Sequence, residues 1–304
     1  MIVVTGGAGF IGRALVRRLR ALRREVVVVD TAPPEAGSGV EWLDRDIRDR
    51  RLPIELAQRR VSAVIHLAAR ASVTAYGPAA VEAEPVNVGG TLAVLEACRL
   101  AEIPRFVLAS SAAVYGDAGE EPIPEERPFA PRSAYGASKV AAEAYTGAYA
   151  RATGLQVTIL RPATVYGPGQ RPALEGAACA AFADALARGA QGTIYGDGLQ
   201  TRDYLFVEDA ARAFALAATA PVWGGTYNIS TGARVSIADL YRALAEAAGV
   251  NAEPTYGPER PGDIRHSLLD PGRIGRELGW RAEVPLAEGL VRTVAWVVGK
   301  GGGA

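Results

Sequence analysis

The 304-residue sequence has few of the residues that most often bind metals or form cross-links. It contains two cysteines and two histidines, and among its 33 basic residues only Lys139 and Lys300 are lysines. Cys98 and Cys179 lie far apart without metal-ligand spacing, and only His66 and His266 could join them as imidazole ligands. We therefore expect neither a disulfide framework nor a metal site.

The sequence also lacks an excess of either charge. Lys plus Arg and Asp plus Glu both number 33, so no surplus of basic charge is available to neutralise a phosphate backbone or an anionic bilayer. The opening residues 1–4 have no basic flank that would suggest a signal peptide, and no apolar run approaches the length of a membrane span. We expect a cytoplasmic protein that binds neither nucleic acid nor membranes.

What the sequence does contain is a regular alternation of apolar strands and helices. Strand-like runs at 1–5, 25–29, 61–67, 105–110 and 155–160 alternate with helical segments, of which the longest are at about 78–101 and 134–153. Strands that are apolar throughout predict an α/β fold with a Rossmann-like doubly wound parallel sheet. Beyond Arg161, prolines and glycines interrupt shorter segments and indicate a smaller α/β domain. We assign 1–161 with about 202–222 to the first domain, and about 162–201 with 223–304 to the second.

A glycine-rich turn follows the first strand. Gly6, Gly9 and Gly12 are spaced three apart and precede a helical pattern, so the backbone can approach a pyrophosphate at the helix N-terminus. Asp30 ends the second strand about 20 residues downstream, where a carboxylate accepts the adenosine ribose hydroxyls. A carboxylate there repels a 2′-phosphate, so NAD is favoured over NADP.

The same turn allows two other interpretations. A glycine-rich strand-to-helix turn can exist without any ligand, but the position of Asp30 favours a dinucleotide. Residues 7–12 also have the glycine spacing of a P-loop, yet Arg13 and Ala14 replace the Lys and Ser/Thr that would hold phosphate and magnesium.

The Gly6-x-x-Gly9-x-x-Gly12 spacing resembles that of the extended short-chain dehydrogenase/reductase family, and the resemblance extends nearly from end to end. Asp46-Ile47 resembles the family's adenine-contacting pair, residues 66–69 its segment along the cofactor, and Asn87 its structural asparagine. The resemblance implies that the first domain binds NAD. The implied cofactor-binding residues are Gly6, Gly9, Phe10, Ile11, Gly12, Asp30, Thr31, Asp46, Ile47, Leu67, Ala68, Ala69, Asn87, Ala109, Tyr135, Lys139 and Pro162.

Tyr135 and Lys139 lie four residues apart at the start of a predicted helix, hence on one face. A tyrosine pKa of about 10 must fall to about 7 for the phenolate to act as a base at neutral pH, which takes roughly 4 kcal/mol. A neighbouring ammonium and the positive nicotinamide ring can supply much of this stabilisation. The alternative is an amphipathic helix with a surface lysine, but lysine is so rare in this chain that its presence here favours catalysis.

Ser111 follows the strand at 105–110, at the edge of the sheet where such folds bind ligands. It matches the family's catalytic Ser/Thr, although a serine there could also simply cap a loop. Related sugar-nucleotide 4,6-dehydratases carry an Asp-Glu pair directly after this hydroxyl, whereas this chain has Ala112 and Ala113. A methyl group cannot move a proton, so dehydration is disfavoured. Ala113 also replaces the glutamate of the related decarboxylases.

The second half of the chain resembles the nucleotide-sugar site of UDP-hexose 4-epimerases in three segments, at 161–170, 194–204 and 260–263. By that resemblance Arg202 holds the pyrophosphate, Tyr195 lies near the uracil, and Arg260 is a second phosphate ligand with Asp263 as its partner or as a ribose contact. Thr164 stands where the family usually has asparagine. A small Ser267 would admit an N-acetyl group. The substrate contacts implied are Ser111, Tyr135, Thr164, Tyr195, Arg202, Arg260 and Asp263.

The resemblance implies an NAD-dependent UDP-hexose 4-epimerase that converts UDP-galactose to UDP-glucose. Tyr135 would remove the 4-hydroxyl proton while C4 gives hydride to NAD, and a transient 4-keto sugar would rotate before the hydride returns. The alternatives are a 4-epimerase of UDP-glucuronate or a UDP-N-acetylhexosamine, a reductase, or a non-catalytic NAD-binding regulator. The resemblance also implies a homodimer through the helices at about 78–101 and 134–153.

Overall fold

The computed structural model describes residues 1–70, 84–172, 177–221, 224–260 and 262–301. Its main feature is a seven-stranded sheet in the order β11-β6-β5-β4-β1-β2-β3, in which every pair of neighbours is parallel. The strands are β1 (Ile2–Thr5), β2 (Val26–Asp30), β3 (Glu41–Asp44), β4 (Ala63–His66), β5 (Arg105–Ala109), β6 (Gln156–Pro162) and β11 (Gly225–Ile229). The strand order reverses beside β1, as in a doubly wound fold, so the predicted fold class is confirmed.

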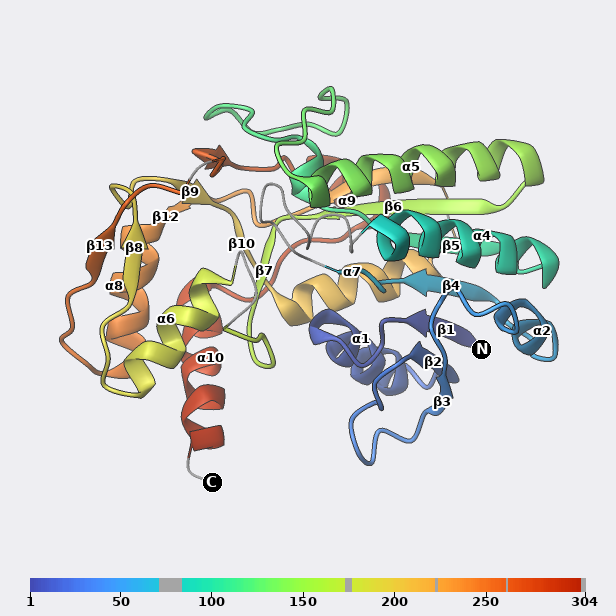
Figure 1. Ribbon diagram of the computed structural model, residues 1–304, viewed down its shortest axis with the longest axis horizontal. Coiled ribbons are helices and arrows are strands. Elements are labelled where there is room, and N and C mark those ends of the chain that lie inside the picture. Colours follow the sequence, from blue (N-terminus) through green and yellow to red (C-terminus); the bar gives the residue numbers. More distant parts are fainter. Residues whose placement is uncertain (71–83, 173–176, 222–223, 261, 302–304) are drawn as a thin grey trace.

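Alternate residues of these strands pack against helices on opposite faces of the sheet, which is why the strands are apolar throughout. Val4 and Val107 belong to one buried cluster with α1 (Phe10–Ala21) and α7 (Val207–Thr219). Val3 and Phe106 belong to another, with α2 (Leu52–Ala57), α4 (Gly90–Leu100) and α5 (Ala134–Thr153). Figure 1 shows α4 and α5 on one side of the sheet and α1 and α7 on the other.

The two longest predicted helices differ in how closely their predicted bounds match those in the structure. Helix α5 has the predicted bounds, because the Ser133 hydroxyl accepts the Gly136 N–H at 3.1 Å at its start and Gly154, with φ +75°, ends it. The predicted helix at 78–101 lies partly outside the described residues. Within them, a π-helical turn, η1 (Pro85–Gly89), leads directly into α4.

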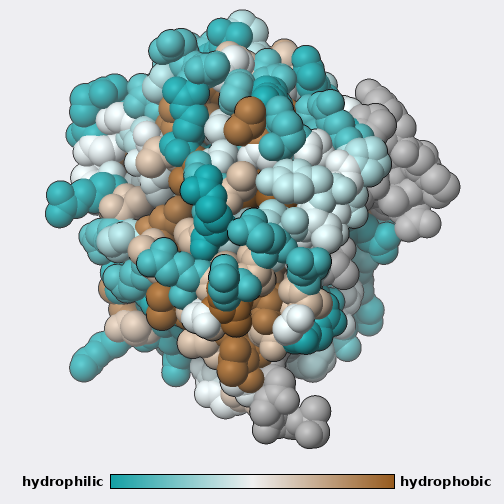
Figure 2. All heavy atoms as spheres, turned by 90° about the vertical axis from the view of Figure 1, so that its left-hand side faces the viewer, coloured by the Kyte–Doolittle hydropathy of each residue, from teal (hydrophilic) through white to brown (hydrophobic). Residues whose placement is uncertain are grey.

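The remaining elements form a smaller body with its own core. Its strands are β7 (Thr164–Tyr166) beside β10 (Tyr204–Phe206), β9 (Thr201–Arg202) between β12 (Val235–Ser236) and β14 (His266–Ser267), and β8 (Thr193–Tyr195) beside β13 (Thr255–Gly257). Helices α6 (Ala178–Ala187), α8 (Ile237–Ala248) and α10 (Leu286–Gly301) enclose a third apolar cluster. The outer face of this body is mostly hydrophilic, with apolar groups between the polar ones (Figure 2).

The predicted division into two domains stays a prediction, and one strand bears on its boundary. Residues 225–229 fall in the predicted second domain, yet as β11 they pair with β6 at the edge of the large sheet. Helix α9 (Gly272–Leu278) packs beside β11. The chain therefore returns to the first body after forming part of the second.

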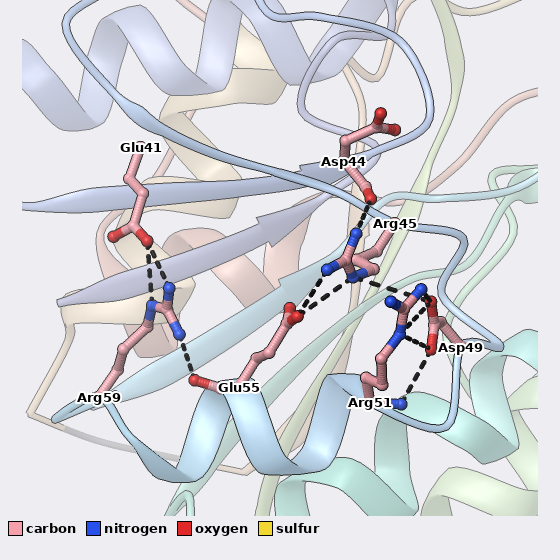
Figure 3. Close-up of polar contacts among 7 residues, drawn as sticks. All are labelled: Glu41, Asp44, Arg45, Asp49, Arg51, Glu55 and Arg59. Carbon is pink, nitrogen blue, oxygen red and sulfur yellow. Dashed lines mark hydrogen bonds and ion pairs between the residues drawn. The ribbon is translucent and has the colours of Figure 1, made fainter.

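An ion-pair network fixes the edge of the sheet at β3. Arg45 donates to the Glu55 carboxylate at 2.8 and 3.1 Å, and Arg59 donates to Glu41 on β3 itself (Figure 3). Asp49 pairs with Arg51 in the same loop. The network holds the segment between β3 and α2, in which Asp46 and Ile47 lie.

Within the described ranges, no helix combines the length and apolarity needed to cross a membrane, and no three His, Cys, Asp or Glu side chains gather as a metal site.

Cys98 and Cys179 are buried thiols in separate cores, and burial raises the pKa of each to about 12. They are structural residues.

Candidate active site

The glycine-rich turn between β1 and α1 can be built only from small residues. A Cβ on Gly6, whose φ is +72°, would lie 2.7 Å from the Ala68 nitrogen, and one on Gly12 would lie 2.2 Å from the Gly6 carbonyl oxygen. Gly9 is the N-cap of α1, and no side chain caps the helix there. The first-turn N–H groups of α1 are thus left for an anion, which fits a pyrophosphate. Phe10 and Ile11 follow, half-buried, on the first turn.

Asp30 ends β2 directly beside this turn. One carboxylate oxygen accepts the Ala8 N–H and the other accepts the Ala32 N–H, both at 3.0 Å. Each oxygen keeps a second lone pair, so the carboxylate is oriented and can still accept ribose hydroxyls. Thr31 follows and is exposed.

The predicted adenine-contacting pair lies at the end of β3. Arg48 donates to both carboxylate oxygens of Asp46, at 2.8 and 2.7 Å, and this hydrogen bonding lowers the pKa of the Asp46 carboxyl. Ile47 is buried, and a Cβ on Gly90 would lie 2.3 Å from its Cδ1. Asp46 therefore stays ionised, while Ile47 packs against the start of α4.

The segment after β4 is tied to the turn and to α5. The Leu67 N–H donates to the Thr5 carbonyl, and Ala68 packs against Gly6, with Ala69 next in the chain. Buried Asn87 holds both backbone groups of Arg70 and donates to Ser138 on α5 at 3.0 Å. Asn87 thus ties the segment after β4 to α5, and the cofactor contact implied for it stays a prediction.

Ser111, Tyr135 and Lys139 converge at the carboxyl end of β5. The Ser111 hydroxyl accepts the Ala113 N–H at 3.1 Å at the start of η2 (Ala112–Val114) and is hydrogen-bonded to the Tyr135 phenol. The Lys139 Nζ lies 5.7 Å from the centroid of the Tyr135 ring and donates to the Ala109 carbonyl at 2.8 Å. The structure therefore brings the three predicted catalytic residues together.

The electrostatics of this group differ from the prediction in one respect. Burial raises the pKa of the Tyr135 phenol, and the hydrogen bond from Ser111 opposes that rise. Burial lowers the pKa of Lys139 to about 8, and Glu143 opposes that fall. In the chain by itself, burial therefore sets the direction of the tyrosine shift, and the lowering expected from Lys139 stays a prediction. The stabilisation of the phenolate expected from the nicotinamide charge stays a prediction as well.

Three buried residues beneath this group were missed from the sequence. Glu143 accepts two hydrogen bonds from Arg161, at 2.6 and 2.9 Å, and one from Ser110 at 2.5 Å. Glu143 and Arg161 are 6% and 5% exposed, which is rare for a charged pair. The spacing of four residues from Lys139 to Glu143 on one helix was the available signal.

The predicted nucleotide-sugar residues form a second cluster. Arg202 donates to the Asp263 carboxylate at 2.6 Å, and the Arg260 guanidinium lies 3.9 Å from the centroid of the Tyr195 ring. The Asp263 side chain thus pairs with Arg202, and its predicted alternative role as a ribose contact stays a prediction. Asp263 lies just before β14, and β14 pairs in parallel with β9. This pairing brings Asp263 beside Arg202 on β9.

Thr164 and Pro162 lie between the two clusters in sequence. Pro162 is buried at the end of β6, opposite Ile229, and the half-buried Thr164 donates its N–H to the Asp203 carbonyl at 2.9 Å. Thr164 is thus fixed to Asp203, the residue that follows Arg202.

A cavity of about 130 Å³ adjoins the second cluster. It is lined by Tyr195, Gly196, Asp197, Gln200, Glu259, Asp263, Ile264 and Arg265. The loop after η2 reaches this region, because the Asp117 carboxylate accepts the backbone N–H of Arg265 at 3.3 Å. The segment that begins at Ser111 therefore connects the two clusters.

Comparison with known proteins agrees with this geometry. The model of the "NAD dependent epimerase/dehydratase family" matches residues 2–230. A UDP-glucose 4-epimerase of Mycolicibacterium smegmatis is 39% identical over 302 residues, covering 96% of both chains. A dTDP-glucose 4,6-dehydratase of Neisseria meningitidis is 37% identical over 331 residues, covering 97% of this chain and 92% of that protein. The crystal structure of a Thermotoga maritima UDP-glucose 4-epimerase with UDP-glucose is 35% identical, with a TM-score of 0.93 over 98% of this chain and 99% of that one.

Proposed function

The chain belongs to the NAD dependent epimerase/dehydratase family, and from that premise we propose that it is a 4-epimerase that interconverts UDP-galactose and UDP-glucose. Membership makes it an NAD-dependent enzyme of sugar-nucleotide metabolism; the reaction and the sugar are the proposal. The observation that carries it is the convergence of Ser111, Tyr135 and Lys139 where β5 ends, with alanines at the two positions after the serine.

The cofactor would be held by residues whose geometry fits it. The N-terminus of α1 and Gly6, Gly9 and Gly12 would take the pyrophosphate, and Asp30 the adenosine ribose. When bound, NAD supplies the oxidising equivalent that turns the sugar 4-hydroxyl into a ketone and receives it back. Because epimerisation has no net redox change, we expect the cofactor to stay bound.

The chain's own residues move the proton. Tyr135 accepts the 4-hydroxyl proton and later returns it, and the Ser111 hydroxyl, already bonded to the phenol, orients both groups. Lys139 holds its positive charge beneath the tyrosine ring. Weak binding of the sugar ring, combined with tight binding of the diphosphate, would let the keto sugar rotate and present its opposite face for the return of the hydride.

We assign the binding of the substrate diphosphate to Arg202 and Arg260. A guanidinium donates a planar fork of charge-assisted hydrogen bonds, which suits a diphosphate oxygen pair. Tyr195 would lie against the base, Asp263 would orient Arg202, and Thr164 would contact the nucleotide from the adjoining strand. The bound UDP-glucose in the Thermotoga relative supports this choice of nucleotide.

Two observations bear on the alternatives. Relatives named as dehydratases match this chain, but Ala112 and Ala113 leave no acid or base after Ser111 for the loss of water. Ser267 lies opposite Arg202 in the β14–β9 pairing, so a small side chain adjoins the proposed diphosphate site. UDP-N-acetylhexosamines and UDP-glucuronate therefore belong in any substrate panel, since solved structures of similar chains include a UDP-N-acetylglucosamine 4-epimerase and a protein with UDP-glucuronic acid.

We also propose a homodimer through the outer faces of α4 and α5. Over residues 134–150 of α5 the exposed side chains are small or aromatic, at Ala137, Ala144, Tyr145 and Ala148, and Leu100 is exposed at the end of α4. Small residues let helices of two copies approach closely, and a two-fold axis would pair the same face with itself. The cytoplasmic location and the absence of nucleic-acid and membrane partners stay predictions.

The test of the proposed function is an incubation of the purified protein with UDP-galactose without added cofactor, with products resolved by chromatography. We expect UDP-glucose to form in the wild type, and Tyr135→Phe to lower kcat by about 10² to 10⁴-fold, the usual contribution of an acid–base group. In a parallel incubation with added NADH or NADPH, a steady fall in absorbance at the reduced-nicotinamide band would instead indicate a reductase. Turnover of UDP-glucuronate or a UDP-N-acetylhexosamine alone would reassign the sugar.

A further inference from the structure

Helix α5 contacts three consecutive residues at the end of β5. Lys139 donates to the Ala109 carbonyl at 2.8 Å, Glu143 accepts the Ser110 hydroxyl at 2.5 Å, and Tyr135 is hydrogen-bonded to Ser111. These α5 residues are spaced four apart, so one face of the helix is aligned with the strand end. The middle contact comes from Glu143, which has no place in the proposed reaction.

The Glu143 carboxylate is itself fixed from behind. Arg161 on β6 donates to both of its oxygens, and the same guanidinium donates to the Tyr115 hydroxyl at 2.6 Å and to the Glu125 carbonyl at 2.8 Å. Tyr115 in turn donates to Asn228 on β11 at 2.8 Å. The carboxylate is therefore fixed by Arg161 on β6 and by Ser110 just after β5, and Arg161 is itself held through Tyr115 by β11.

From this arrangement we propose that Glu143 is a positioning residue that keeps the Lys139 ammonium charged and directed at the end of β5. The proposal rests on the proposed role of Lys139 and adds a residue that touches neither substrate nor cofactor. A buried ammonium tends to lose its proton, and the nearby fixed carboxylate opposes that loss. Arg161 pairs with the same carboxylate and therefore limits its pull on the lysine.

The other titratable groups around Lys139 do not replace Glu143. His66 on β4 is buried and its pKa is lowered to about 3, so it is neutral at physiological pH. Tyr135 on the same helix has its pKa raised by burial. Among the described residues, Glu143 is therefore the anion that acts on the ammonium, with Arg161 behind it on β6.

The scarcity of lysine makes a direct test possible. With lysine labelled at Cε, nuclear magnetic resonance of the protein follows only Lys139 and Lys300, and Lys300→Arg assigns the signals. We expect the midpoint of the Lys139 titration to fall by about one unit in Glu143→Gln, the size expected for loss of a close opposite charge. In Arg161→Met the midpoint should rise, because the carboxylate then acts alone. Asp209→Asn, which breaks another buried pair on α7, should leave it unchanged.

A variant that leaves Arg161 unpaired could fail to fold, and the double variant Glu143→Gln/Arg161→Met avoids this. In the double variant, the midpoint of the Lys139 titration should lie below the midpoint found in Arg161→Met. Equal midpoints in those two variants, or in Glu143→Gln and the wild type, would overturn the proposal. The titration needs no substrate, so it is independent of whether UDP-galactose is turned over. In an active enzyme, Glu143→Gln should lower kcat above the new midpoint with little change in KM.

Discussion

The Arg260 guanidinium lies 3.9 Å from the centroid of the Tyr195 ring, so the proposed phosphate ligand covers one face of the proposed base-contacting residue. Such a stack orients the guanidinium without using its five N–H donors. The donors therefore stay available to an anion, and one residue can serve both the aromatic ring and a diphosphate.

Loss of either arginine should weaken substrate binding more than catalysis. Hydrogen bonds to charged groups contribute about 1.5 to 3 kcal/mol, so Arg260→Met and Arg202→Met should each raise KM for the UDP-sugar about 10- to 100-fold, with kcat changed little. Steady-state kinetics measure both constants. Arg242→Met is the matched control, because Arg242 pairs with Asp239 at the surface, away from the cavity. An unchanged KM in both site variants would remove these residues from the diphosphate site.

The glycine-rich turn gives a prediction about the cofactor. A Cβ at position 12 would lie 2.2 Å from the Gly6 carbonyl oxygen, so Gly12→Ala must move the turn away from the N-terminus of α1. We expect the purified variant to lose bound NAD, measured by denaturing the protein and assaying the released nucleotide. Gly147→Ala in α5 is the control, since its Cβ would meet only the far end of Arg151 at 3.5 Å. NAD retained at wild-type stoichiometry in Gly12→Ala would contradict the assignment of the turn.

Buried His66 predicts how stability depends on pH. Its imidazole bonds Thr5 at 2.7 Å and Thr91 at 3.1 Å, and burial lowers its pKa from 6.5 to about 3. The unfolded chain binds a proton below pH 6.5 that the folded chain does not, so stability is present above pH 6.5 and is lost as the pH falls toward 3. By this linkage the free energy of unfolding should drop by about 2 kcal/mol between pH 8 and pH 5 from this group alone.

The measurement is urea unfolding at several pH values for the wild type and His66→Asn. The variant is expected to be less stable throughout, but its stability should fall less steeply between pH 6.5 and 5. Parallel pH profiles in the two proteins would mean that His66 takes up a proton in the folded state.

The exposed helix faces predict where two copies meet. Tyr145 on α5 and Leu100 on α4 are 44% and 52% exposed, and a charge placed at either would be buried unpaired in a dimer. Tyr145→Glu and Leu100→Glu should therefore shift the mass found by light scattering to the monomer value of 31.8 kDa. Val298→Glu, at an equally exposed apolar position on α10, should leave the mass unchanged. Dimers in both interface variants would place the contact elsewhere.

The sequence predicted the sheet and the residues that converge at the end of β5 because their signals are local. Apolar strands, the spacing of Gly6, Gly9 and Gly12, and the four-residue step from Tyr135 to Lys139 each specify a short stretch of backbone, and the family match is in agreement with them. What the sequence missed depends on contacts between distant segments. Glu143 meets Arg161 across α5 and β6, and Asp263 meets Arg202 only because β14 pairs with β9.

Charge behaviour was the least predictable part of the site. Sequence spacing places an ammonium near a phenol, but the direction of a pKa shift depends on burial and on which atom the ammonium contacts. Here the Lys139 amine reaches the Ala109 carbonyl, and burial determines the direction of the shift for Tyr135. Neither the depth of burial nor that carbonyl can be inferred from a four-residue spacing.

The hydrogen bond between Ser111 and Tyr135 predicts a specific change in the pH dependence of catalysis. The bond lowers the pKa of the phenol, so Ser111→Ala should raise that pKa, and the acidic limb of the kcat profile should move to higher pH. At pH 7 the loss of the hydroxyl should reduce kcat by about 10²-fold or more, within the range for one acid–base contact.

Ser111→Thr is the matched variant, because it keeps the hydroxyl and adds only a methyl group. It should retain the wild-type position of the limb and most of the activity. If Ser111→Ala lowers kcat equally at every pH, the serine orients the sugar without acting on the tyrosine. That result would separate the two roles proposed for Ser111, which are to orient the sugar and to lower the pKa of Tyr135.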